Sequence, residues 1–265
     1  MRGKILVLLL FFCLCTQAAS SPTPTLIIAA DRWCPYNCAP KSEHPGFMIE
    51  IAQRIFAQHC IKIEYRIMPW SRAIQGTRQG EFDAVVGASK ADARDFVFPL
   101  VEQGRMKNSF WVRQDAQWRY QGIESLQYNI LGVSSEYSYG PKLDDYIANP
   151  NNAFYIQVMY GSSPLKTGLK MLSAKRIDIF IEDESVFRHY MMSQSSPSSF
   201  KQAGSLSLED DFANVFVAFS PAKQDSAHWA DILSLGTEQL RASGELQKIL
   251  SAYGLEDWRQ PEDNN

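Results

Sequence analysis

Apolar strands alternate with amphipathic helices along this chain, and that alternation restricts its fold more than any other feature. Residues 26–30 are uniformly apolar, and Met48, Ile51, Ala52 and Ile55 then follow with the spacing i, i+3, i+4, i+7. Apolar residues with this spacing lie on one face of a helix. Because strands separated by helices usually pair side by side in the same direction, the pattern predicts an α/β fold with a mostly parallel sheet.

The same alternation occurs in both halves of the chain. The further predicted elements, in chain order, are a strand at 61–68, a helix at 71–79, strands at 82–87 and 130–133, a helix at 143–148, a strand at 154–160, a helix at 165–172, strands at 177–181 and 214–219, and two C-terminal helices. No tight sequence repeat accompanies this order. We therefore expect two similar α/β lobes rather than one continuous sheet.

The first twenty residues have the pattern of an export signal. Arg2 and Lys4 precede a short apolar run at 5–14, and small residues follow at 18–20. The apolar run is shorter than the roughly 20 residues that cross a bilayer. We therefore expect a cleaved Sec-type signal peptide over 1–20 and a mature protein in the periplasm.

Charge and motif content argue against several classes of protein. A net charge of −3 and a pI of about 5.9 give no support for nucleic-acid binding. The four histidines form no HExxH pair, and the S-x-x-K match at 163–166 has no K-T-G companion. No G-x-S-x-G elbow or phosphate loop occurs. We predict no catalytic residues, no metal site and no cofactor.

Three cysteines remain after the predicted cleavage: Cys34, Cys38 and Cys60. In an exported protein this number suggests one disulfide and one free thiol. A structural zinc site needs four ligands, and the C-x-x-x-C spacing differs from the C-x-x-C of thioredoxin-like proteins. We expect a disulfide between Cys34 and Cys38, with Cys60 free. A bond between Cys38 and Cys60 stays open, because the sequence gives no distances.

Three stretches give the chain a resemblance to a known family. The segments PGFMIEIAQRIF, MPWSRAIQGTRQGEFDAVVGAS and SGELQKILSAYGL resemble, in order and spacing, motifs of the bacterial extracellular solute-binding proteins of family 3, the polar amino-acid type. The resemblance implies a two-lobed, type II periplasmic-binding-protein-like fold with two crossover hinge strands. Residues 21–112 and 214–265 would form lobe one, and 113–213 lobe two, with a ligand enclosed between them.

The resemblance also implies ligand contacts from lobe one. Trp33 and Trp70 fall where the family places residues that sandwich the ligand. Gly87 and Ser89 would offer a backbone N–H and a hydroxyl to a ligand carboxylate, and Arg94, five residues after Ser89, would clamp that carboxylate with two hydrogen bonds. The segment before Arg94 is one residue shorter than the family pattern, so an outward-pointing Arg94 is the alternative. For the tryptophans the alternative is ordinary core packing.

Further candidates complete the predicted site. Arg72 is a second basic candidate, with a solvated helix face as its alternative. Ser135 and Ser138 lie in a turn that resembles the family's anion-binding turn in lobe two. Asp183 stands where the family holds the ligand's ammonium group, and Glu182 beside it would assist. Plain loop charge is the alternative for this acidic pair.

These features lead to an expected function. We expect a monomeric solute-binding protein that closes two lobes around an amino acid or a similar zwitterion. Its partners would be the ligand and either an inner-membrane ABC permease or a sensor kinase. Two alternatives stay open: an enzyme on the same fold, such as a dehydratase, and an interaction module that has lost its ligand.

Overall fold

The computed structural model of the 265-residue chain describes residues 23–194, 199–207 and 209–259. The predicted signal peptide lies outside these ranges. Within them, no helix combines the length and the apolar character that a membrane crossing requires.

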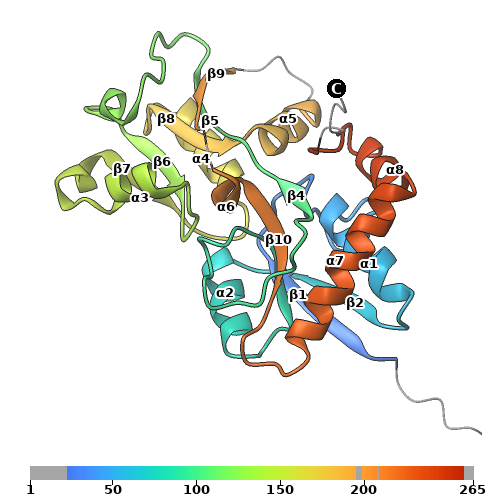
Figure 1. Cartoon of the computed structure of the whole chain (residues 1–265). Helices are drawn as coiled ribbons and strands as arrows, with labels where there is room; N and C mark the ends of the chain where they lie inside the picture. The colour runs from blue at the N-terminus through green and yellow to red at the C-terminus, as the bar shows by residue number, and fades with distance from the viewer. Residues whose placement is uncertain (1–22, 195–198, 208, 260–265) are drawn as a thin grey trace, which may run out of the picture.

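The first sheet has the strand order β2-β1-β3-β10-β4 (Figure 1). Strand β1 (Thr25–Ala30) pairs in parallel with β2 (Lys62–Ile67) and with the central strand β3 (Ala84–Ala88), and β10 (Asn214–Phe219) lies antiparallel to β3 and to β4 (Gly104–Arg105). The apolar stretches 26–30 of β1 and 84–88 of β3 are buried on both faces except at the partly buried Ile27 and Gly87, as their sequences predict.

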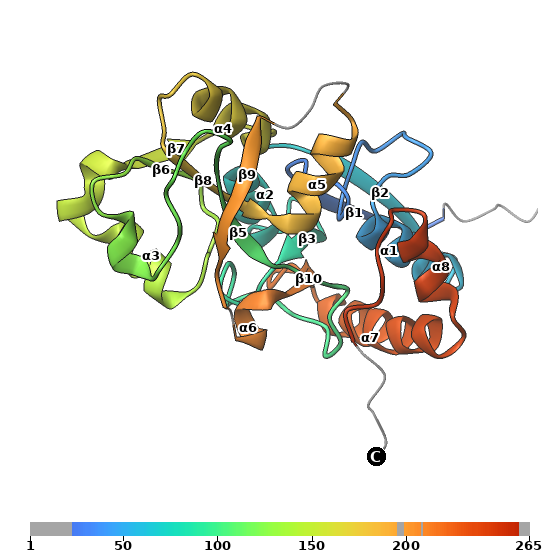
Figure 2. The same cartoon turned by 90° about the horizontal axis from the view of Figure 1, so that it is seen from above.

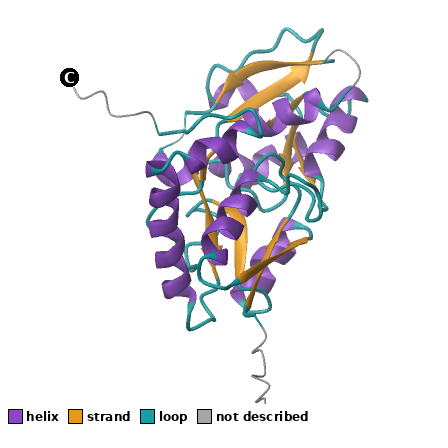
Figure 3. Cartoon of the chain, turned by 90° about the vertical axis from the view of Figure 1, so that its right-hand side faces the viewer, coloured by secondary structure: helices purple, strands orange, loops and turns teal. Residues whose placement is uncertain are grey.

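The second sheet has the order β7-β6-β8-β5-β9, and Figure 3 shows the strands of the molecule in two separate groups. Here β6 (Leu131–Ser134) is parallel to β7 (Ile156–Met159) and β8 (Ile179–Asp183), while β5 (Asn108–Arg113) is antiparallel to β8 and β9 (Phe200–Ser205). We call the parts built on the first and second sheets lobe one and lobe two. The expected two-lobed α/β fold is thus confirmed.

Helices cover the sheets in both lobes (Figure 2). Those of lobe one are α1 (Phe47–Ala57), α2 (Trp70–Arg78), α7 (Ser226–Ala242) and α8 (Glu245–Ser251), and the others are α3 (Pro141–Ala148), α4 (Pro164–Ser173), α5 (Glu184–Met192), α6 (Asp210–Ala213) and the 3-10 turns Ile123–Leu126 and Pro150–Tyr155. The helices α1 and α7 pack closely, because Gly236 leaves room for Ile55: a Cβ at Gly236 would lie 2.5 Å from Ile55 Cγ2.

The chain crosses from lobe one to lobe two between β4 and β5, and it returns between β9 and β10. The predicted lobe limits at 112/113 and 213/214 stay a prediction. One predicted strand differs in the structure. The segment 154–160 begins as part of a 3-10 turn, and only Ile156–Met159 pairs with β6.

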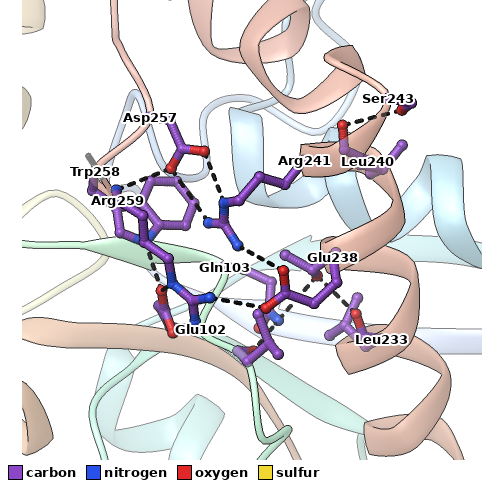
Figure 4. A network of polar contacts seen from close by, with 12 residues as sticks. Glu102, Gln103, Leu233, Glu238, Leu240, Arg241, Ser243, Asp257, Trp258 and Arg259 are labelled. Atoms are coloured by element: carbon purple, nitrogen blue, oxygen red, sulfur yellow. Dashed lines mark hydrogen bonds and ion pairs between the residues drawn. The ribbon is translucent and has the colours of Figure 1, made fainter. Parts of the chain in front are cut away.

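A polar network fastens the C-terminal segment beside the first crossing (Figure 4). The buried Glu102, two residues before β4, accepts hydrogen bonds from Arg259 Nε and Nη2, both at 2.7 Å, and from Trp258 Nε1 at 2.8 Å. Arg241 of α7 binds Asp257 at 2.8 Å. Burial opposes the charge of Glu102, but the Arg259 and Trp258 hydrogen bonds outweigh it and lower the pKa of this carboxyl.

The substitution Glu102→Gln should therefore lower the free energy of unfolding by about 1–2 kcal/mol, since it weakens charge-assisted hydrogen bonds to a half-exposed arginine. The lowered pKa means that the stabilisation is present above pH 4.5 and is lost as pH falls. Urea titrations at pH 7 and pH 3.5 test both statements. The exposed pair Arg54–Glu245 provides the control, because Arg54→Ala should cost no more than about 0.5 kcal/mol. Equal losses in the two variants would contradict the role given to the network.

Candidate functional site

The loop after β1 is closed by a disulfide between Cys34 and Cys38, as predicted. Two backbone hydrogen bonds join Trp33 and Asn37 across the same loop, at 3.0 and 3.1 Å. The ring of Tyr36 stacks on Trp33 with centroids 4.0 Å apart. Cys60 is exposed and unpaired, which confirms the expected free thiol. The loop therefore holds Trp33 in one orientation at the edge of lobe one.

Within the described ranges, one group of three side chains has metal-ligand spacing: Cys34, Cys38 and His189 lie within 4.8 Å of one another. His189 Nε2 is 3.1 Å from Cys34 Sγ. Zinc is bound by cysteine thiolates, and both sulfurs here are joined to each other. The group therefore acts as a contact between the lobes rather than as a metal centre.

The two lobes are closed on each other by hydrogen bonds near the carboxyl ends of the parallel strands. Trp33 Nε1 of lobe one donates to Glu182 Oε1 of lobe two at 3.0 Å. Tyr137 Oη of lobe two donates to Asp31 Oδ2 of lobe one at 2.6 Å. Ligands of open α/β sheets bind in the same region, beyond the carboxyl ends of the strands. The contacts therefore define the cleft in which a solute would lie.

A cavity of about 20 Å³ lies within this cleft, a size that holds one water molecule. Its wall includes three aromatic residues, Trp33, Trp70 and Tyr137, and four polar ones, Asp31, Asn37, Asp92 and Ser138. A recess of about 190 Å³ shares Asp31, Trp70 and Tyr137 with the cavity and extends to Ser135 and Tyr160 of lobe two. Both tryptophans predicted to contact a ligand thus lie at the cleft.

Gly87 forms part of the same wall and has a φ of 91°, a conformation that favours glycine. A Cβ at this position would lie 3.4 Å from Trp33 Cε3. A side chain at residue 87 would therefore strain the backbone and crowd the indole.

Ser89, predicted to contact a ligand carboxylate, and Ser138, predicted to lie in an anion-binding turn, both donate to a carboxylate of the protein itself. Asp92 Oδ2 accepts from the backbone N–H and the hydroxyl of Ser89, each at 2.7 Å. Its Oδ1 accepts from the backbone N–H of Ser138 in lobe two at 3.0 Å. Asp92 therefore occupies an anion cradle made by both lobes.

The predicted basic residues lie elsewhere. Arg94 is exposed and lines a separate hollow of about 340 Å³ with Phe98 and Phe212. Arg72 is exposed on α2. Neither the cavity nor the recess is lined by a lysine, arginine or histidine of the described ranges. The structure thus brings the predicted aromatic and serine residues together, and it leaves out both arginines.

Asp183 and Glu182 have different surroundings at the end of β8. Asp183 caps helix α5 by accepting from the backbone N–H groups of Ser185 and Val186 at 2.8 and 3.0 Å, and it also accepts from the Lys107 N–H at 2.7 Å. Tyr36 Oη of lobe one also donates to Asp183 Oδ2 at 3.3 Å, so Asp183 joins the first crossing, the cap of α5 and the opposite lobe. Glu182 Oε1 accepts from Trp33, whereas its buried Oε2 has no hydrogen-bond partner among the described residues. A ligand role for either residue stays a prediction.

Burial raises the pKa of each carboxyl group in this cleft, because the charged form loses hydration. The pKa of Asp31 rises to about 7 and that of Glu182 to about 8, in each case chiefly by desolvation and despite hydrogen bonds from Tyr137 and Trp33. Desolvation also raises the pKa of Asp92 to about 6, although Ser89 and Ser138 donate to it. The closed cleft is therefore acidic and short of positive charge.

Sequence reasoning missed Asp31, Asn37, Asp92 and Tyr137. Asp31 directly follows the buried strand 26–30, and Asp92 follows Ser89 by three residues, so position at a strand end was the available signal. The signal was weak because acidic and polar residues at strand ends are commonly solvated. Nothing local indicates that Tyr137 reaches across to the other lobe.

Comparisons with known proteins agree with this architecture. The family model of the bacterial extracellular solute-binding proteins, family 3, matches residues 26–256. A comparison with curated proteins finds no match. A solved histidine kinase sensor domain with similarity to periplasmic binding proteins is 18% identical, with a TM-score of 0.69, and the alignment covers 88% of this chain and 98% of that one.

Two further solved structures contain arginine. An amino acid ABC transporter substrate-binding protein from Streptococcus pneumoniae bound to L-arginine is 20% identical, with a TM-score of 0.67 and coverage of 88% of this chain and 95% of that one. An ancestral arginine-binding protein bound to arginine is 16% identical, with a TM-score of 0.65 and coverage of 86% and 97%. At these identities the likeness shows the fold.

The raised pKa values predict that closure without a ligand depends on pH. In an open form Asp31 and Glu182 meet water, with ordinary values of 3.8 and 4.5, so the closed form binds more protons from there up to about pH 8. Asp31 is faced by Tyr137 and Asp92, and Glu182 is faced by Trp33 and Asp183. The closed fraction should therefore fall as pH rises from about 4 to about 8 and change little above that.

Small-angle X-ray scattering in phosphate buffer free of organic cations measures this fraction from the radius of gyration. The variant Asp31→Asn cannot ionise at this position and should lose the part of the change that Asp31 causes between about pH 4 and pH 7. A closed fraction that is constant or rises with pH would contradict the assignment.

Proposed function

The chain belongs to the bacterial extracellular solute-binding proteins, family 3, and we propose that it captures a small polar solute carrying an ammonium group by closing its two lobes around it. The observation that carries this proposal is the cleft itself, in which Trp33, Trp70 and Tyr137 surround buried carboxylates at the junction of the lobes. Aromatic faces and carboxylates together attract organic cations.

Amino acids and similar zwitterions are the ligand class expected from the sequence. Two structural neighbours are described with arginine bound, and arginine carries an ammonium group. The positions of four predicted residues support the proposal: Trp33, Trp70 and Gly87 line the cavity, and Glu182 accepts a hydrogen bond from Trp33 Nε1. Closure around the solute would be a hinge motion at the two crossings.

The place of action follows from the family. Extracellular solute-binding proteins act outside the cytoplasm, and we propose the periplasm for this chain, after removal of residues 1–20. The closed form would be recognised by an inner-membrane ABC permease or by a sensor kinase. Neighbours of both kinds, a transporter component and a kinase sensor domain, support the two options equally.

The relatives are binding proteins rather than enzymes. Capture without turnover is therefore our proposal for this chain. Thermal-shift screening against amino acids and small amines, followed by mass spectrometry of the recovered ligand, distinguishes capture of the solute from its enzymatic conversion. A stabilising solute that is recovered unaltered supports capture, and conversion of that solute would support an enzyme on the same fold.

The variant Trp70→Ala tests the proposed cleft. It should weaken binding of a stabilising solute by about 10- to 50-fold, because it removes a desolvated aromatic face beside the cation. Calorimetry gives the dissociation constants. The matched control is Phe154→Ala, since Phe154 is 83% exposed in lobe two and lies outside the cleft; its affinity should equal that of the unmodified protein. Equal affinities in all three proteins would contradict the proposed site.

A further inference from the structure

Asp92 accepts hydrogen bonds from Ser89, the residue predicted from the sequence to hold a ligand carboxylate. The Ser89 hydroxyl and N–H from lobe one and the Ser138 N–H from lobe two converge on its two oxygens. Three donors aimed at one carboxylate satisfy it well, since hydrogen bonds to a charged acceptor are stronger than those to a neutral one. A ligand therefore does not need to supply a carboxylate for the lobes to join at this point.

The same cleft lacks the positive charge that an additional carboxylate would require. Its walls include Asp31 and Asp92, with Glu182 behind Trp33, and no lysine, arginine or histidine of the described ranges lines either the cavity or the recess. A ligand carboxylate placed beside these groups would be buried among like charges, which is costly in a medium of low dielectric constant. A cation in the same place would be stabilised.

The dimensions and the unused acceptors fit an ammonium group. The cavity of about 20 Å³ admits a group the size of a water molecule. Asn37 lines the cavity and is fully buried. Its Nδ2 donates to the backbone carbonyl of Asp31 and to Tyr65 Oη, whereas its Oδ1 has no hydrogen-bond partner among the described residues. The recess of about 190 Å³ beside Trp70 and Tyr137 then offers room for the remainder of a short chain.

A metal ion fits this geometry less well. The carboxylates of the cleft do not form a group of three with metal-ligand spacing, and within the described ranges only Cys34, Cys38 and His189 do. The aromatic walls favour an organic cation as well.

From these observations we propose that the ligand is an organic amine without a carboxylate, whose ammonium group enters the cavity between Asp31, Asn37 and Asp92 while its chain lies along Trp70 and Tyr137. This inference rests on the proposed function, solute capture between the lobes, and specifies the class of solute. Asp92 replaces the carboxylate that an amino acid would bring.

Pairs of candidate ligands, each an amine and the amino acid that differs from it only by a carboxylate, test the proposal. Calorimetric titrations at pH 8 compare agmatine with arginine, cadaverine with lysine and putrescine with ornithine. At least one amine should bind ten or more times more tightly than its amino acid. Tighter binding of the amino acids would overturn the inference and leave solute capture standing. If none of the six compounds binds at millimolar concentration and none closes the lobes in small-angle scattering, both the amine inference and the proposed solute capture are overturned.

The variant Asp92→Ala gives a second, independent result. It empties the cradle of Ser89 and Ser138, so the affinity ratio of arginine to agmatine should rise at least tenfold relative to the unmodified protein. The charge control is Asp231→Asn on the exposed face of α7, which should leave the ratio unchanged. An unchanged ratio in a folded Asp92→Ala protein would refute the role of Asp92 as the built-in carboxylate. Circular dichroism verifies folding, and the matched pairs decide the ligand class even if this variant fails to fold.

Discussion

The closed arrangement depends on buried and partly buried carboxylates at the junction of two lobes, where no lysine, arginine or histidine of the described residues lines the cavity or the recess. Asp31 and Asp92 come from lobe one and Glu182 from lobe two, and each is held by donors that reach across the cleft: Tyr137, Ser138 and Trp33. Hydrogen bonds offset part of the desolvation cost, but they do not remove the charge. The cleft is therefore closed most favourably when protons or a bound cation neutralise these groups, and this links closure to ligand capture.

The surrounding structure keeps these groups in position. The disulfide between Cys34 and Cys38 fixes Trp33, and Asp183 joins the cap of α5 to the first crossing through the Lys107 N–H. On the opposite side of the crossing, Glu102 ties the C-terminal segment to the residues that lead into β4. The segment on which a hinge motion would turn is thus held at both ends.

Much of this fold could be predicted from the sequence, because hydrophobic spacing reports local structure directly. The parallel strands β1, β2, β3, β6 and β8 and the disulfide follow from it and from the number of cysteines. The antiparallel strands β5 and β9 were harder to predict, since their pairing depends on crossings between lobes that no local pattern records. The site was partly predictable in the same way. Trp33, Trp70 and Ser89 lie at the cleft, whereas the outward position of Arg94 depends on the loop geometry after β3.

The most direct measurement of cation-dependent closure is a distance between the lobes. Cys60 is a natural exposed thiol in lobe one, and Phe154→Cys supplies a second label site in lobe two, so paired spin labels report the separation by double electron–electron resonance. In buffer without organic cations, the distance distribution should shift to longer values between pH 6 and pH 8.5, and agmatine should restore the short distance at pH 8.5. A distribution that responds neither to pH nor to the amine would contradict closure governed by the buried carboxylates.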